Sequence, residues 1–303
     1  MVYLEYNILG KNKQIKIDEM DHHENKNVIM HDEKHYEYKI GKKEQDTFKK
    51  LLKILKLWNE FTEQNRIDYW ACGGTLLGAV RHSGFIPWDN DIDVCIMLSD
   101  LKKVKRKLDG HPILKYYECE CGLRIYIKNK NDKNNGLDDL DDDAKTFPFM
   151  DIFICDYYNK ITVNFCGFLS SDGDPTWFMS DLFPNQHIYS NELYPLKQVA
   201  FEGIIIMVPN NQINVLYRNF SDKCLTICKI SKHVGFHEGV IQNKKIQEEQ
   251  YMFSKNLYSI EKLFNIPREN TLNTYKYKLI KNAMVSEPII KLFDNSLVKK
   301  ILN

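Results

Sequence analysis

The sequence lacks the features of a membrane-spanning or nucleic-acid-binding protein. Across 303 residues, no uninterrupted apolar run reaches the ~18 to 20 residues that a spanning helix requires. The 42 basic and 41 acidic side chains give a formal net charge of +1, which provides no electrostatic footprint for nucleic acid or an anionic membrane. We therefore expect no transmembrane segment and no nucleic-acid partner.

The first residues also lack the pattern of a secretory leader. MVYLEYNILGKNKQ has neither a basic n-region nor a sustained apolar h-region, which predicts a cytoplasmic location. Several of the eight cysteines fall inside apolar, strand-like runs. Such cysteines are typically reduced and buried, so a disulfide framework is not expected.

The remaining composition, 43% apolar and 27% charged, is that of a globular protein long enough to bury a sizeable core. Changes in patterning along the chain divide it into three regions. We expect an irregular N-terminal extension over 1–42, a core over 43–230 and a mostly helical C-terminal region over 231–303.

Helices and strands are mixed along the core. Apolar residues at helical spacing predict an amphipathic helix over 44–66. A second helix is expected over 98–110, capped by Ser99 and ended by Gly110. Further elements are a hairpin over 199–209, a helix over 210–219, and strands over 67–72, 113–119, 123–128 and 149–158. This order predicts an α+β fold.

The segment between the first two helices carries paired carboxylates. Asp91 and Asp93 are two positions apart in a strand-like run, so both side chains project from one face. Mg²⁺ and Mn²⁺ prefer oxygen ligands, commonly one or two carboxylates together with substrate phosphates. The pair therefore predicts a site for Mg²⁺ or Mn²⁺ on a nucleotide, whereas a solvated strand end is the simpler alternative.

A glycine turn precedes this pair. Gly73 and Gly74 allow close backbone approach, and Thr75 is placed to cap the following helix. The free N–H groups of a helix start attract anions, which predicts a phosphate site. Arg81 and His82 stand at the far end of the same helix, where a cation and a hydrogen-bonding ring are available for substrate.

A third carboxylate lies further along the chain. Asp151 falls between apolar residues of the strand over 149–158, where it needs a partner, and a cation shared with Asp91 and Asp93 would supply one. By strand parity Asp156 points to the opposite face and is assigned a structural role. Arg124 falls in the strand over 123–128, where it could reach a phosphate, although an ordinary surface arginine is the simpler interpretation.

Three segments together resemble the LicD family of phosphocholine and glycan phosphotransferases, which is related to the fukutin-type enzymes and has a nucleotidyltransferase-like fold. They are GGTLLGAVRHSGFIPWDNDIDV, FMDIFICD at 149–156 and YPLKQVAFEGIIIMVPNN at 194–211. The likeness covers about 45–220. Asn90 departs from it, because the family has an acidic residue there, and the match weakens after Asn211.

The resemblance implies a mixed sheet flanked by helices and a metal-dependent transferase that moves phosphocholine or a polyol phosphate from a CDP-linked donor to a glycan or glycoconjugate. Asp91, Asp93 and Asp151 would be catalytic and hold Mg²⁺ or Mn²⁺, and Asp89 and Lys197 would bind substrate with the glycine turn. Two alternatives stay open. The fold could transfer a nucleoside monophosphate, or it could be retained in a binding protein without catalytic activity.

Overall fold

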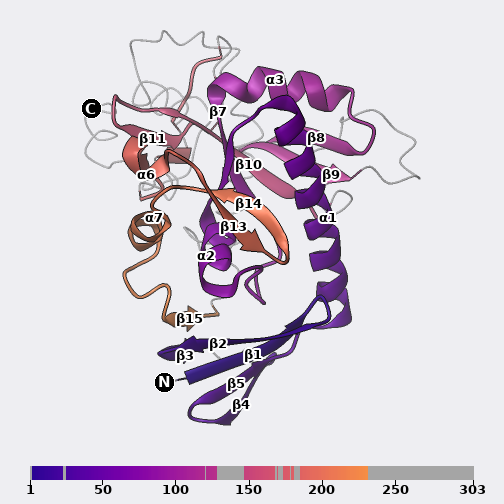
Figure 1. Cartoon of the computed structure of the whole chain (residues 1–303), viewed down its shortest axis with the longest axis vertical. Helices are drawn as coiled ribbons and strands as arrows, with labels where there is room; N and C mark the ends of the chain where they lie inside the picture. The colour runs from indigo at the N-terminus through magenta and orange to yellow at the C-terminus, as the bar shows by residue number, and fades with distance from the viewer. Residues whose placement is uncertain are drawn as a thin grey trace, which may run out of the picture.

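The computed structural model describes residues 2–22, 25–119, 121–127, 147–167, 169, 173–177, 179–180 and 185–230. Within them the fold is α+β, as expected, with mixed sheets flanked by helices (Figure 1). The C-terminal region over 231–303, for which helices were expected, lies outside the described residues.

The N-terminal residues form a small sheet, so the expectation of an irregular extension over 1–42 is wrong. Its strand order is β2-β1-β5-β4. The strands here are β1 (Val2–Ile8), β2 (Lys11–Ile17), β4 (Val28–Asp32) and β5 (His35–Tyr38), with the short β3 (Glu19–Asp21) between them. Alternate side chains of β1 are buried, which anchors this sheet to the rest of the protein.

The long helix α1 (Lys42–Asn65) connects the N-terminal sheet to the main sheet. In Figure 1 it runs along one side of the molecule from the N-terminal sheet toward α3. Phe48, Leu51, Leu55 and Trp58 are all buried at helical spacing, as the sequence predicted. The helix ends at Arg66 in the left-handed conformation, and the chain enters the main sheet.

Seven strands form the main sheet, whose central path runs β12-β11-β10-β7-β6. The β8–β9 hairpin joins it through β9, which pairs with the first half of β10. The strands are β6 (Tyr69–Ala71), β7 (Asp93–Met97), β8 (Leu114–Cys119), β9 (Gly122–Ile127), β10 (Met150–Tyr157), β11 (Thr162–Phe165) and β12 (Ile188–Tyr189). Apart from the parallel pair β7–β10, neighbouring strands of this sheet are antiparallel.

Two helices follow β6 and β7. Helix α2 (Gly73–His82) lies between β6 and β7 in the chain, and α3 (Leu98–Asp109) follows β7 directly. Gly110 ends α3 as expected, but the N-cap position belongs to Met97 rather than Ser99, and its side chain makes no cap bond. Helix α3 packs against β7, β8 and β10.

A separate hairpin and short helices complete the described chain. The hairpin was expected and consists of β13 (Lys197–Phe201) and β14 (Ile204–Val208). It is held beside β6, because the Met207 N–H donates to the Tyr69 hydroxyl at 3.3 Å. The other elements are α6 (Ser190–Leu193), the expected helix α7 (Gln212–Asn219) and β15 (Ile227–Lys229), which pairs with β3.

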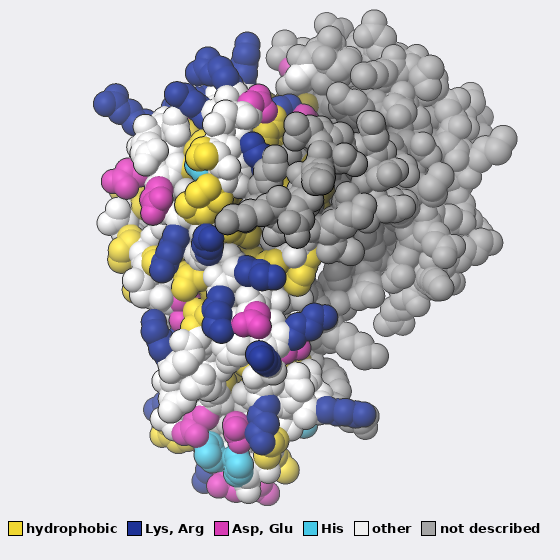
Figure 2. Space-filling view, turned by 90° about the vertical axis from the view of Figure 1, so that its right-hand side faces the viewer, with side chains coloured by type: hydrophobic (Ala, Val, Ile, Leu, Met, Phe, Trp, Pro, Cys, Tyr) yellow, Lys and Arg dark blue, Asp and Glu magenta, His cyan; other side chains and the backbone are white. Residues whose placement is uncertain are grey.

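The surface of the described chain is mixed in character. On the face in Figure 2, basic and acidic side chains are interspersed with apolar ones along the length of the molecule. Among the helices of the described residues, none has the length and apolar composition needed to cross a membrane.

Candidate functional site

Two of the expected site residues meet at the centre of the main sheet. Asp93 opens β7, and Asp151 is the second residue of β10. The strands are parallel, and these residues are register partners, so their side chains lie on one face of the sheet. Adjacent strands are only about 4.8 Å apart, which brings two carboxylates close together in the protein interior.

Asp89 and Asp91 join this pair from the preceding loop. Asp91 was expected within the strand, but the strand begins only at Asp93, because the β6 ladder ends at Val94. The pKa of Asp93 is raised well above its ordinary value, first by burial and then by the nearby charges of Asp91, Cys72, Asp151 and Asp89. A carboxylate in this setting gains stability when a proton or a cation neutralises it.

The glycine turn lies directly against these carboxylates. Gly73 begins α2 with a φ of +52°, and a Cβ added there would lie 2.8 Å from Asp93 Oδ2. A Cβ on Gly74 would collide with Asp89 Oδ2. Both glycines are therefore required for the backbone of the helix start to approach the acidic side chains.

Thr75 connects the helix to the strand rather than capping the helix. Cys72 occupies the N-cap position and makes no side-chain cap bond. The buried Thr75 hydroxyl instead accepts a hydrogen bond from the Asp93 N–H at 2.8 Å. The expected cap is wrong, but the residue fixes the first position of β7 relative to the glycine turn.

Arg81 and His82 lie in the last turn of α2, at the opposite end of the helix from the glycine turn. Arg81 Nη1 donates to the carbonyl oxygens of Cys224 at 2.7 Å and Ile227 at 3.1 Å. His82 is buried and its Nδ1 lies 2.9 Å from the Tyr6 hydroxyl on β1. Burial, followed by the charges of Arg81 and Lys13, lowers the pKa of His82 well below its ordinary value. These two residues thus join α2 to its neighbours. Arg81 also lies near enough to Asp89 for the two charges to interact, although its hydrogen bonds go to main-chain carbonyls.

Lys197 and Asp156 were also assigned roles from the sequence, and both lie in strands. Lys197 is exposed at the start of β13, on the hairpin that packs beside α2 and β6. Asp156 lies near the other end of β10 from Asp151, where its Oδ1 accepts a hydrogen bond from the Tyr157 N–H at 2.9 Å. That local bond agrees with the structural role expected for Asp156.

Arg124 lies beside the carboxylates, although the sequence favoured a surface position for it. It is not an ordinary surface arginine, since only 15% of its side chain is exposed. Its Nε donates to Asp151 Oδ1 at 2.7 Å, and its guanidinium lies 4.2 Å from the centre of the Phe149 ring. A lone arginine in the apolar strand GLRIYI was the available signal. Its partner could be identified only from the β9–β10 register, which pairs Arg124 with Asp151.

The chemistry of this arrangement suits a hard cation and a phosphate. Carboxylate oxygens are the ligands that Mg²⁺ and Mn²⁺ prefer, and two strands, with Asp93 and Asp151, and the loop before β7, with Asp91, supply them. The start of α2 adds free backbone N–H groups beside them. Arg124 adds a fixed positive charge on the other side of Asp151.

The same residues fall inside a recognised family domain. Residues 66–211 match the family model described as LicD/FKTN/FKRP, nucleotidyltransferase domain. This segment is a LicD-type domain. The match contains every carboxylate of the site, the glycine turn, Arg124 and the β13–β14 hairpin.

The chain is also similar to individual proteins, over different lengths. The uncharacterized protein RT0683 of Rickettsia typhi is 32% identical over 200 residues, which is 66% of this chain and 54% of that protein. The chain thus spans about half the length of that relative. The lipopolysaccharide cholinephosphotransferase LicD of Haemophilus influenzae is 56% identical over 43 residues, 14% of this chain and 16% of its own. Human ribitol 5-phosphate transferase FKRP is 54% identical over 35 residues, 12% of this chain and 7% of its own.

Proposed function

We propose that the LicD-type domain is a metal-dependent transferase that moves a phospho-alcohol, phosphocholine or a polyol phosphate, from a CDP-linked donor to a glycan or glycoconjugate. The observation that carries the proposal is the cluster of Asp93 and Asp151 in register on parallel strands, with Asp89 and Asp91 beside them at the start of α2. Two similar proteins are named as a lipopolysaccharide cholinephosphotransferase (LicD) and a ribitol 5-phosphate transferase (FKRP), which supports this class of substrate.

Asp91, Asp93 and Asp151 would hold Mg²⁺ or Mn²⁺, because they offer carboxylate oxygens to one region and their charges already act on one another at Asp93. Their oxygens do not all lie within 4.8 Å of one another, so binding of the cation would draw them together. The cation supplies neutralisation of the donor's phosphate charge. The helix start at Gly73 and Gly74 binds phosphate oxygens through backbone N–H groups. Phosphoryl transfer requires mainly positioning and charge stabilisation from a protein, and these groups provide both.

Asp151 and Arg124 have linked roles in this scheme. The ion pair fixes the orientation of the Asp151 carboxylate, and Arg124 supplies a positive charge within reach of the same region. Asp151 is also suited to accept a proton from the acceptor hydroxyl, since a carboxylate at the edge of the site can act as a general base. Arg124 takes the part for which Arg81 was considered, because Arg81 is engaged with main-chain carbonyls.

A ligand screen tests this function. CDP-choline, CDP-ribitol, CDP-glycerol and nucleoside triphosphates are each added with Mn²⁺ or with a chelator, and the melting temperature is recorded. A ligand at 100 times its Kd stabilises the folded state by about 2.7 kcal/mol, which is readily detected. Stabilisation by a CDP-alcohol that requires the metal supports the proposal, and no stabilisation by any of the three CDP-alcohols contradicts it.

The main alternative is transfer of a nucleoside monophosphate, which is favoured by the family model's description as a nucleotidyltransferase domain. The two reactions differ in their products. The proposed reaction releases CMP and leaves a modified glycan, whereas the alternative releases pyrophosphate and leaves a nucleotidylated target. A binding protein without catalytic activity would yield neither product, even where the ligand and Mn²⁺ bind.

A further inference from the structure

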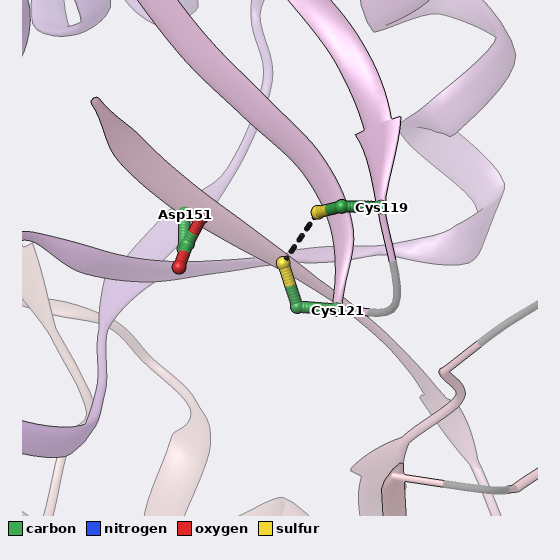
Figure 3. Close-up of side chains that lie close together, drawn as sticks. All are labelled: Cys119, Cys121 and Asp151. Carbon is green, nitrogen blue, oxygen red and sulfur yellow. Dashed lines mark hydrogen bonds between the residues drawn. The ribbon is translucent and has the colours of Figure 1, made fainter. Parts of the chain in front are cut away.

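Two cysteine thiols lie beside the acidic site and have no role in the proposed transfer. Cys119 ends β8 and Cys121 begins the turn into β9, with one residue between them. Their Sγ atoms are 3.0 Å apart, and both lie close to a carboxylate oxygen of Asp151 (Figure 3). One ligand atom from each of the three residues fits within 4.8 Å of the other two. In the part of the chain that the structure describes, no other group of three His, Cys, Asp or Glu side chains meets this condition.

We propose that Cys119, Cys121 and Asp151 form a second cation site, for a thiophilic divalent ion such as Zn²⁺. Two sulfur ligands distinguish it from the all-oxygen site of Asp91, Asp93 and Asp151, because thiolates bind Zn²⁺ in preference to Mg²⁺. Three protein ligands leave the fourth tetrahedral position for water or a substrate atom, as in zinc sites that remain open.

The distances fit an ion with little movement of the chain. Zn–S bonds of about 2.3 Å at a tetrahedral angle place two sulfurs about 3.8 Å apart, so the two thiols must separate by about 0.8 Å. Cys119 is half-buried at the end of β8, whereas Cys121 is only 4% exposed. We therefore expect the Cys119 side chain to make most of this movement.

The charges also fit. Two thiolates and a carboxylate carry three negative charges, which a divalent ion and the Arg124 guanidinium would balance. Arg124 contacts Asp151 at 2.7 Å, so its charge lies within the same group of side chains. Only 13% of the Asp151 side chain is exposed, and a buried carboxylate surrounded by other acids benefits from such compensation.

Because Asp151 belongs to both sets of ligands, Zn²⁺ bound here would compete with the hard cation for that carboxylate. This consequence rests on the proposed function, whereas binding of Zn²⁺ itself does not. Zn²⁺ is therefore expected to inhibit the transferase at concentrations that leave Mg²⁺ in excess, and removal of both thiols should relieve that inhibition.

The test uses the reduced, metal-free full chain. Zn²⁺ binding is measured by competition with a chromophoric chelator for wild type, Cys119→Ser, Cys121→Ser and the matched control Cys228→Ala, which removes a buried thiol on β15, outside the main sheet. We expect Cys119→Ser and Cys121→Ser each to weaken binding at least ~10-fold, because loss of even an outer partner of a ligand costs about that much, and the control to bind as wild type does. Equal binding by wild type and the Cys119→Ser/Cys121→Ser variant would overturn the site.

A second measurement does not depend on the variants folding. Wild-type protein is treated with an alkylating reagent with and without Zn²⁺, and the modified cysteines are identified by peptide mass. Zn²⁺ should slow the alkylation of Cys119 at least ~10-fold, because a thiolate bound to a metal is no longer available as a nucleophile. Alkylation of Cys119 at the same rate with and without Zn²⁺ would refute the proposal.

The variant Asp93→Asn separates the Zn²⁺ site from the proposed transferase function. It should lose Mn²⁺-dependent donor binding and keep Zn²⁺ binding.

Discussion

Asp93 and Asp151 face each other across the only parallel strand pair of the main sheet, β7–β10, over the described residues. The backbone holds both carboxylates in place, because each lies near the start of a strand and is followed by residues that are buried or packed in the core, Val94–Met97 and Ile152–Cys155. The sheet therefore keeps the two carboxylates close enough to repel each other, and the proposed cation would relieve that repulsion.

Replacing Asp93 by Asn should leave the metal-free protein as stable as wild type or more so. The change keeps the size of the side chain and removes a buried charge whose pKa is raised by burial and by Asp91. Urea unfolding in the presence of a chelator measures the free energy of unfolding. Asp156→Asn is the control: the Asp156 carboxylate accepts a local hydrogen bond from the Tyr157 N–H, so removing its charge should not raise the free energy of unfolding. A large loss of stability in Asp93→Asn alone would contradict the repulsion.

Arg124→Gln should destabilise the metal-free protein by about 1.5 to 3 kcal/mol, the usual value of a hydrogen bond to a charged group. Saturating Mn²⁺ should recover a large part of this loss, because the cation replaces the positive charge beside Asp151. Arg81→Gln is the matched control, as Arg81 bonds to main-chain carbonyls and its loss should not be recovered by metal. Thermal unfolding of both variants with and without Mn²⁺ distinguishes them, and equal recovery in the two would argue against the role of Arg124.

Gly74→Ala should weaken donor binding at least ~10-fold while the protein still folds. The added Cβ would displace the Asp89 carboxylate and block the backbone approach at the start of α2. Gly110→Ala provides the control, because a Cβ there meets nothing within 4 Å. The affinity for the CDP-alcohol found in the screen is measured by calorimetry. Wild-type affinity in Gly74→Ala would remove the glycine turn from the site.

His82 should make the protein sensitive to acid. Its pKa is lowered in the folded state by burial, so below the ordinary value of 6.5 the unfolded chain takes up a proton that the folded chain does not. The free energy of unfolding should therefore fall as the pH decreases from 6.5. His82→Gln should flatten this slope, whereas Tyr6→Phe, which removes only the hydroxyl partner, should retain it. The slope is obtained from denaturation curves between pH 7 and pH 5, and an unchanged slope in His82→Gln would contradict the assignment.

The sequence predicted those parts of the fold whose signal is local. Helix α1 followed from buried residues at helical spacing, and β10 from the apolar run around Asp151. The N-terminal sheet was missed although β1 alternates apolar residues from Val2 to Ile8, which was a readable strand signal. Its partner β2 is mostly exposed and alternates only at Ile15 and Ile17, so the pairing of the two strands was not evident from the sequence of β2.

The carboxylates and the glycine turn of the site could be predicted from the sequence, because residue type and spacing alone indicate metal and phosphate binding. The pairing of Arg124 with Asp151 was not, since it depends on strand register between distant segments. The direction of Arg81 was equally hidden, because its carbonyl partners lie 143 and 146 positions away. A lone arginine in an apolar strand was the local sign of the first contact, but it did not identify the partner.

The most direct test of the account is a titration of Mn²⁺ followed by electron paramagnetic resonance, in the presence of the CDP-alcohol that the screen identifies. We predict that Asp91→Asn and Asp93→Asn each weaken Mn²⁺ binding at least ~10-fold and lower turnover at least ~10²-fold, as expected for loss of one preorganised charge contact. Asp151→Asn should behave in the same way, and Asp156→Asn should bind Mn²⁺ as wild type does. Wild-type Mn²⁺ affinity and turnover in Asp91→Asn or Asp93→Asn would contradict the central claim that these carboxylates hold the metal.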